Sequence, residues 1–126
     1  MRAVSTALLM LLFVGCQTGE KPMQRTELFF GLSRPDGGAI SEQVWQAFVD
    51  DAVTPRFPEG FTVIDGAGQW RGADGKIVHE RSKVLLLLHP RDAATMKKVD
   101  EIRAAYKARF NQEAVIRESG EVRVSF

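Results

Sequence analysis

The stretch Val84-Leu85-Leu86-Leu87-Leu88 is apolar at every position and completes a segment, residues 76–89, that Pro90 follows. An apolar run of this kind is typical of a strand that is buried on both faces of its sheet. The turn signal Gly72-Ala73-Asp74-Gly75 precedes the segment, and residues 61–70 before that turn begin with an alternating pattern. Two strands joined by a short glycine-containing loop predict a β-hairpin.

Two helices are expected, one on each side of this hairpin. Before it, Ser41 is the expected N-cap, and Pro55 ends the helix because proline disfavours helical geometry in the preceding residue. After the hairpin, Asp92 is the expected N-cap and Asn111 the expected C-terminal cap. The buried stripe of the second helix is predicted to consist of Met96, Val99, Ile102, Tyr106 and Phe110.

The outer strands complete the predicted fold. Residues 26–33 read as the first strand, residues 114–117 as the last, and residues 122–126 could pair with the last strand across Ser119-Gly120. The element order is then β-α-β-β-α-β, which is the split βαβ or ferredoxin-like arrangement of the α+β class. In it, two helices cover one face of an antiparallel sheet, and a chain of 126 residues has room for one such domain.

The second face of this sheet would have no helix over it. Residues 84–88 are nevertheless apolar on both sides of the pleat, and Phe29 and Phe30 repeat the pattern on the first strand. The simplest cover is a second copy of the same sheet, so the sequence predicts a homodimer packed through the open sheet face.

Composition excludes several classes of function. The 17 basic and 16 acidic side chains give a formal charge of +1, so no nucleic-acid partner is predicted. A single cysteine rules out an internal disulfide framework and a thiolate-rich metal site. The only histidines, His79 and His89, lie too far apart on one strand to chelate a single metal, although a site with one histidine ligand remains open. No metal and no cofactor are predicted.

The N-terminus reads as a targeting signal. A cationic start at Arg2 precedes an apolar run that is too short to span a bilayer. The segment Phe13-Val14-Gly15-Cys16 resembles the lipobox of bacterial lipoproteins, which implies lipidation of Cys16 and cleavage before it; an ordinary secretory signal is the alternative. Gln17 then follows the anchor, which by the same resemblance favours the outer membrane facing the periplasm. The predicted organisation is a signal peptide over residues 1–15, a tether over 16–24 and one domain over 25–126.

A charged cluster interrupts the predicted hairpin. A regular ladder that pairs Arg71 with Lys76 and Asp65 with Ser82 places several large polar and aromatic side chains on one face. Arg81 would bind a carboxylate or phosphate, Trp70 would offer a stacking surface and His79 could transfer a proton. The candidate ligand-binding residues are Glu27, Trp70, Arg71, His79, Arg81 and Lys83.

The same cluster has a structural interpretation. Glu27 on the first strand could pair with Arg81 or Lys83 across the sheet. The charges would then form an ion-pair network that fixes the register or a dimer contact. Both interpretations stay open at the level of sequence.

Five sequence blocks together resemble one family, the domain-of-unknown-function family 3574. The blocks are residues 26–31, 54–58, 68–71, 80–83 and 106–110. The resemblance extends from about residue 24 to the end of the chain. It implies a small bacterial envelope protein, many members being expected lipoproteins, and it implies no activity.

Two functions from different classes remain. The first is a lipid-anchored binding or structural module of the cell envelope. The second is an enzyme similar in shape to small dimeric α+β barrel monooxygenases and isomerases, acting on a small anionic or aromatic ligand. A cavity holding Trp70, Arg81 and Tyr106 would favour the enzyme.

Overall fold

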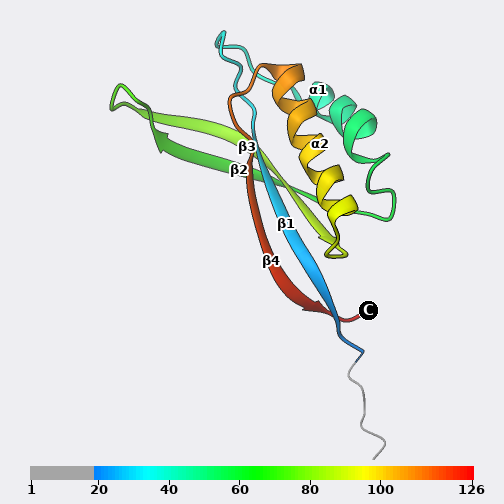
Figure 1. Ribbon diagram of the computed structural model, residues 1–126. Coiled ribbons are helices and arrows are strands. Elements are labelled where there is room, and N and C mark those ends of the chain that lie inside the picture. The colour runs from blue at the N-terminus through cyan, green and yellow to red at the C-terminus, as the bar shows by residue number, and fades with distance from the viewer. Residues whose placement is uncertain (1–18) are drawn as a thin grey trace, which may run out of the picture.

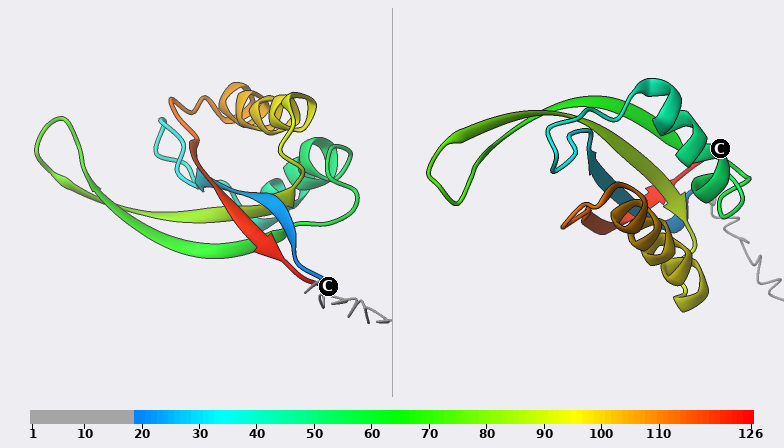
Figure 2. Two further views of the ribbon diagram at one scale, coloured as in Figure 1. Left: turned by 60° about the horizontal axis from the view of Figure 1, so that its bottom comes forward. Right: turned by 90° about the horizontal axis from the view of Figure 1, so that it is seen from above.

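The computed structural model describes residues 19–126 of the chain and consists of one antiparallel sheet with helices on one side (Figure 1). Figure 2 shows both helices over the same face of the sheet, so the α+β class with an antiparallel sheet and two helices is confirmed. The four strands lie in the order β2-β3-β1-β4. The elements are β1 (Lys21–Gly31), α1 (Glu42–Phe48), the π-helix η1 (Val49–Val53), β2 (Thr62–Arg71), β3 (Ile77–His89), α2 (Ala93–Phe110) and β4 (Ile116–Val124).

The first and last strands are longer than the sequence indicates. β1 begins at Lys21, so residues 21–24 belong to the sheet and not to the predicted tether over 16–24. β4 is continuous from Ile116 to Val124, and the prediction that residues 122–126 fold back across Ser119-Gly120 is wrong. Both differences have one cause: β4 pairs along its full length with residues 21–29 of β1, which satisfies backbone groups that a turn or a tether would leave to water. The predicted signal peptide and Cys16 lie outside the described residues.

The helix ends follow the capping residues in the sequence. Val44 N donates to Ser41 Oγ at 3.3 Å, and Thr95 N donates to Asp92 Oδ1 at 2.7 Å. Asn111 adopts the left-handed conformation, with φ of 52°, at the end of α2. All three predicted caps are therefore confirmed. The last turns before Pro55 are wider than α-helical, because Thr54 N donates to the Val49 carbonyl five residues earlier at 2.9 Å.

Aromatic side chains fill the space between the helices and the sheet. The Phe30 and Tyr106 rings lie 4.7 Å apart, and the Phe48 and Tyr106 rings lie 5.0 Å apart. The Tyr106 hydroxyl donates to the Gly31 carbonyl at 2.7 Å, and burial raises the pKa of Tyr106 well above its usual range. Tyr106 therefore joins α2 to β1 inside the core and does not offer its hydroxyl to a ligand.

The register of the β2–β3 hairpin differs from the predicted one by a residue. Arg71 lies opposite Ile77 and Asp65 opposite Lys83, whereas the regular ladder predicted Lys76 and Ser82 as their partners. The loop is one residue longer than expected, since Gly72 N donates to the Lys76 carbonyl and Gly75 takes a positive φ of 80°. A shift of one residue moves the side chains of one strand to the other face relative to its neighbour.

Candidate functional site

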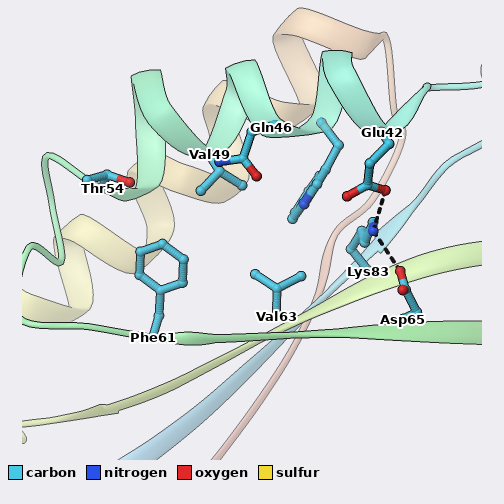
Figure 3. Close-up of a pocket in the computed structure, with 9 residues that line it drawn as sticks. Glu42, Gln46, Val49, Thr54, Phe61, Val63, Asp65 and Lys83 are labelled. Atoms are coloured by element: carbon cyan, nitrogen blue, oxygen red, sulfur yellow. Dashed lines mark hydrogen bonds and ion pairs between the residues drawn. The ribbon is translucent and has the colours of Figure 1, made fainter.

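A groove of about 320 Å³ opens between α1 and the edge strand β2 (Figure 3). Its walls combine apolar side chains from both elements with an ionic cluster at one end. The lining residues are Glu42, Trp45, Gln46, Val49, Thr54, Phe61, Val63, Asp65 and Lys83.

Lys83 is the centre of the ionic cluster. Its side chain is 4% exposed, and its Nζ donates to Glu42 Oε2 and to Asp65 Oδ1, each at 2.6 Å. The fold places each partner: Asp65 lies directly opposite Lys83 in the hairpin, and Glu42 is the first residue of α1, after the Ser41 cap. Three elements therefore meet at one buried ammonium group.

The cluster favours the charged forms of Lys83 and Asp65. Burial lowers the pKa of Lys83, but the hydrogen bonds that Lys83 donates to Asp65 and Glu42 outweigh burial and hold that pKa above its ordinary value. The hydrogen bond from Lys83 lowers the pKa of Asp65 in turn. A lysine that stays protonated is neither a nucleophile nor a general base at neutral pH. One cation with two carboxylates gives this end of the groove a net charge of −1.

The rest of the groove is apolar with two neutral polar groups. Phe61 and Val63 lie on the β2 side and Val49 on the α1 side, while Gln46 and Thr54 add an amide and a hydroxyl (Figure 3). A ligand with an apolar body and one polar or charged end fits such a surface.

Of the predicted site residues, Lys83 alone lines this groove. β1 ends opposite Ser82, so the outer part of the hairpin extends past it (Figure 1). Arg71, His79 and Arg81 are exposed on that outer part, on the same side of the hairpin as Lys83.

Two predicted partners lie on the other face of the sheet. Trp70, which is 53% exposed, points to the open face, because the register shift separates it from His79 and Arg81. Glu27 also lies on the open face and accepts a hydrogen bond from Arg25 Nε at 2.8 Å. The predicted grouping of Trp70 with Arg81, and the predicted pairing of Glu27 with Arg81 or Lys83, are both wrong.

His89 has a structural role. It is buried at the end of β3, where its ring nitrogens lie 2.9 Å from Thr26 Oγ1 and 2.8 Å from the Pro90 carbonyl. Within residues 19–126, no group of three histidine, cysteine or acidic side chains is placed to hold a metal ion. No helix in that range is both long and apolar enough to cross a bilayer.

Sequence reasoning missed Glu42, Gln46, Thr54 and Phe61 as groove residues. One signal was available for the cluster itself: Lys83, Leu85 and Leu87 alternate on the strand, which places Lys83 on the buried face. A lysine on that face needs a carboxylate partner, and the acidic residue in the first turn of α1 is one candidate.

The chain has structural neighbours of similar fold and low sequence identity. A phage SAM lyase in complex with S-methyl-5'-thioadenosine has a TM-score of 0.60 and 17% identity, with 82% of this chain and 90% of that chain covered. The apo state of a phage SAM lyase has a TM-score of 0.62 and 18% identity, with 87% and 93% covered. At these identities the likeness concerns the fold alone.

The sequence itself matches one family. No curated protein matches the chain significantly. The family model described as "Protein of unknown function (DUF3574)" matches residues 25–126, which contain α1, α2, β2, β3, β4 and most of β1. The resemblance noted in the five sequence blocks is confirmed, and the chain belongs to the DUF3574 family.

Proposed function

We propose that the protein is a lipid-anchored binding domain of the bacterial envelope, and that the groove between α1 and β2 holds a small ligand with a cationic end. The observation that supports this function best is the ionic cluster around Lys83 at one end of an apolar groove. A net charge of −1 beside an apolar surface favours an amphipathic cation.

The geometry of the two carboxylates favours a cation over the small anion suggested by sequence. The Glu42 and Asp65 side chains are 72% and 67% exposed, and each bonds Lys83 through one oxygen. A ligand ammonium or guanidinium group can bind the remaining oxygens without disturbing Lys83. An anion would first have to displace a carboxylate from Lys83.

The anchor is part of the same proposal. The segment Phe13–Cys16 supports lipidation at Cys16, and Gln17 supports an outer-membrane location facing the periplasm. Lys21, where β1 starts, is five residues beyond Cys16, a stretch that spans at most about 18 Å. A domain on so short a connection would stay close to the membrane surface.

We also propose that the fold is ferredoxin-like in its finer topology. The element order β-α-β-β-α-β, with η1 continuing α1, and the strand order β2-β3-β1-β4 support this assignment.

A small enzyme is the second candidate function. The fold likeness to a phage lyase bound to S-methyl-5'-thioadenosine supports it, as do the aromatic groups Trp45 and Phe61 in the groove. S-methyl-5'-thioadenosine is the probe that distinguishes the two: its binding in the groove would favour the enzyme.

Native mass spectrometry of the full chain, extracted from its own host in detergent, tests the binding function. We expect a retained small molecule that is lost in the Glu42→Gln/Asp65→Asn variant and kept in the Glu113→Gln variant, whose side chain is exposed away from the groove. Retention that is unchanged in the double variant would contradict the groove as the binding site.

A further inference from the structure

Four apolar side chains form one row across the whole open face of the sheet. The strand registers pair Ile64 with Val84, Val84 with Phe29 and Phe29 with Ile116. Phe29 and Val84 alternate with the buried core residues of β1 and β3, so the row lies on the face opposite the helices. Ile64 and Ile116 at its two ends are 47% and 65% exposed.

The rows on either side of this apolar row differ in the size of their side chains. On one side, Gly66, Ser82 and Gly31 form a row of small residues. On the other side, the next row contains the larger residues Leu86 and Glu27. The Glu80 side chain covers the Gly31 end of the small row, where its Oε1 accepts a hydrogen bond from Ser33 N at 3.2 Å. The apolar row therefore lies between a row of small residues and a row of larger ones.

We propose that a second copy of this chain packs on the open face, with the two-fold axis along the apolar row. A rotation about that axis places Ile64 over the second copy's Ile64 and keeps each strand over its equivalent. It also places the row of larger residues of each copy over the row of small residues of the other, so that Leu86 lies over Ser82. A surface that complements itself in this way is what an isologous dimer requires.

The charges on the face agree with the same axis. Glu80 lies two residues from Ser82 on β3, and Arg25 lies two residues from Glu27 on the neighbouring strand β1, each on the side away from the apolar row. The rotation brings Glu80 of one copy within one strand spacing of Arg25 of the other. Arg25 uses Nε and Nη2 on Glu27, which leaves Nη1 for this contact.

A two-fold axis parallel to the strands would also place the two apolar rows over each other, but with Ile64 over Ile116 and Val84 over Phe29. That arrangement would keep Glu80 of one copy and Arg25 of the other at opposite ends of the face, so no ion pair between the copies would form. The charge pattern therefore selects the axis along the row.

Thiol cross-linking of the full chain tests the contact and its axis together. Packed sheets lie about 10 Å apart, a gap that a short bismaleimide can join. We expect the Ile64→Cys chain, and separately the Ile116→Cys chain, to form cross-linked dimers in the membrane. The matched control is Val63→Cys, because Val63 is adjacent to Ile64 on β2 and lies on the face toward the helices. The unchanged chain reports any cross-link through Cys16.

Two results would overturn the proposal. One is equal cross-linking of Ile64→Cys and Val63→Cys, or of neither. The other concerns a mixture of the Ile64→Cys and Ile116→Cys chains. If the two chains cross-link to each other, while neither chain cross-links when it is alone, the two-fold axis runs parallel to the strands.

Charge reversal gives a readout that does not depend on cross-linking. We expect Glu80→Arg or Arg25→Glu alone to raise the dissociation constant of the dimer about tenfold in sedimentation experiments, and the double reversal to restore much of the loss. Circular dichroism establishes that each variant is folded. A chain that is monomeric before any substitution, or single reversals without effect on folded protein, would contradict the contact.

Discussion

Lys83 Nζ lies 2.6 Å from Asp65 Oδ1 because the two residues are direct partners in the β2–β3 register. The register that the sequence suggested would place Asp65 opposite Ser82 and Lys83 opposite Ile64. The ion pair would then be lost, and a buried lysine would have to find its charge partners elsewhere. The contact between Lys83 and Asp65 therefore helps to select the observed register, in addition to forming one end of the groove.

The ionic cluster predicts a pH dependence of stability. The folded-state pKa of Asp65 is lowered, so its stabilising contribution is present above its ordinary value of 3.8 and is lost as the pH falls through the lower folded value. The folded-state pKa of Lys83 is raised, so its contribution is present below 10.5 and is lost as the pH rises through the higher folded value.

The Lys83→Met variant removes both contributions. We expect the difference in unfolding free energy between wild type and Lys83→Met to be constant between about pH 5 and 9, and to shift against the wild type at both extremes. Urea unfolding at a series of pH values measures it, with Lys98→Met on the exposed side of α2 as control. A difference that does not change with pH would show that Lys83 does not interact with the two carboxylates.

The hydrogen bond from Tyr106 to the Gly31 carbonyl predicts a graded loss of stability. Tyr106→Phe keeps the ring in the core and removes the hydroxyl, so we expect a loss of about 1 kcal/mol. Tyr106→Ala also removes the ring, and we expect a loss of about 3–5 kcal/mol. Denaturant unfolding of the two variants measures both losses, and an unchanged stability of Tyr106→Phe would contradict the bond.

The end of α2 predicts opposite effects for two substitutions at one position. Asn111 has a φ of 52°, a conformation that glycine adopts freely and alanine does not. We expect Asn111→Gly to stabilise the protein and Asn111→Ala to destabilise it, with about 1 kcal/mol or more between them. Thermal unfolding of the pair gives the order, and the reverse order would be inconsistent with a left-handed cap.

The proposed anchor predicts where the protein is found in cells. We expect the full chain in the membrane fraction, because the acyl chains attach through the Cys16 thiol. We expect the Cys16→Ser variant either in the soluble fraction or with its signal peptide uncleaved. Fractionation and mass spectrometry of the N-terminal peptide measure the outcome. A Cys16 peptide without lipid would exclude the anchor and leave an ordinary secretory signal.

The sequence predicts the elements of this fold well because each has a local cause. Ser41, Asp92 and Asn111 are capping residues whose effect extends over one turn of helix. The apolar run over residues 84–88 identifies the central strand in the same local way. The extent of β1 and β4 was underestimated, since their outer residues become strand only by pairing with each other.

The site was less predictable for a physical reason. A loop one residue longer than expected reverses the faces of one hairpin strand, so Trp70 was grouped with Arg81 although they lie on opposite sides. The partnership of Lys83 with Glu42 depends on where α1 crosses the sheet, and no sequence spacing encodes that crossing.

A titration with two matched probes tests most directly whether the groove binds cations. 2-Phenylethylamine and 3-phenylpropionate share an aromatic body and differ in the sign of their charge, and NMR chemical shifts can follow both on the same sample. We expect the amine to shift the resonances of Gln46, Thr54 and Val63, the propionate to shift them far less, and the preference to disappear in Glu42→Gln/Asp65→Asn. Equal shifts with both probes, or shifts from the propionate alone, would contradict a cation site beside Lys83.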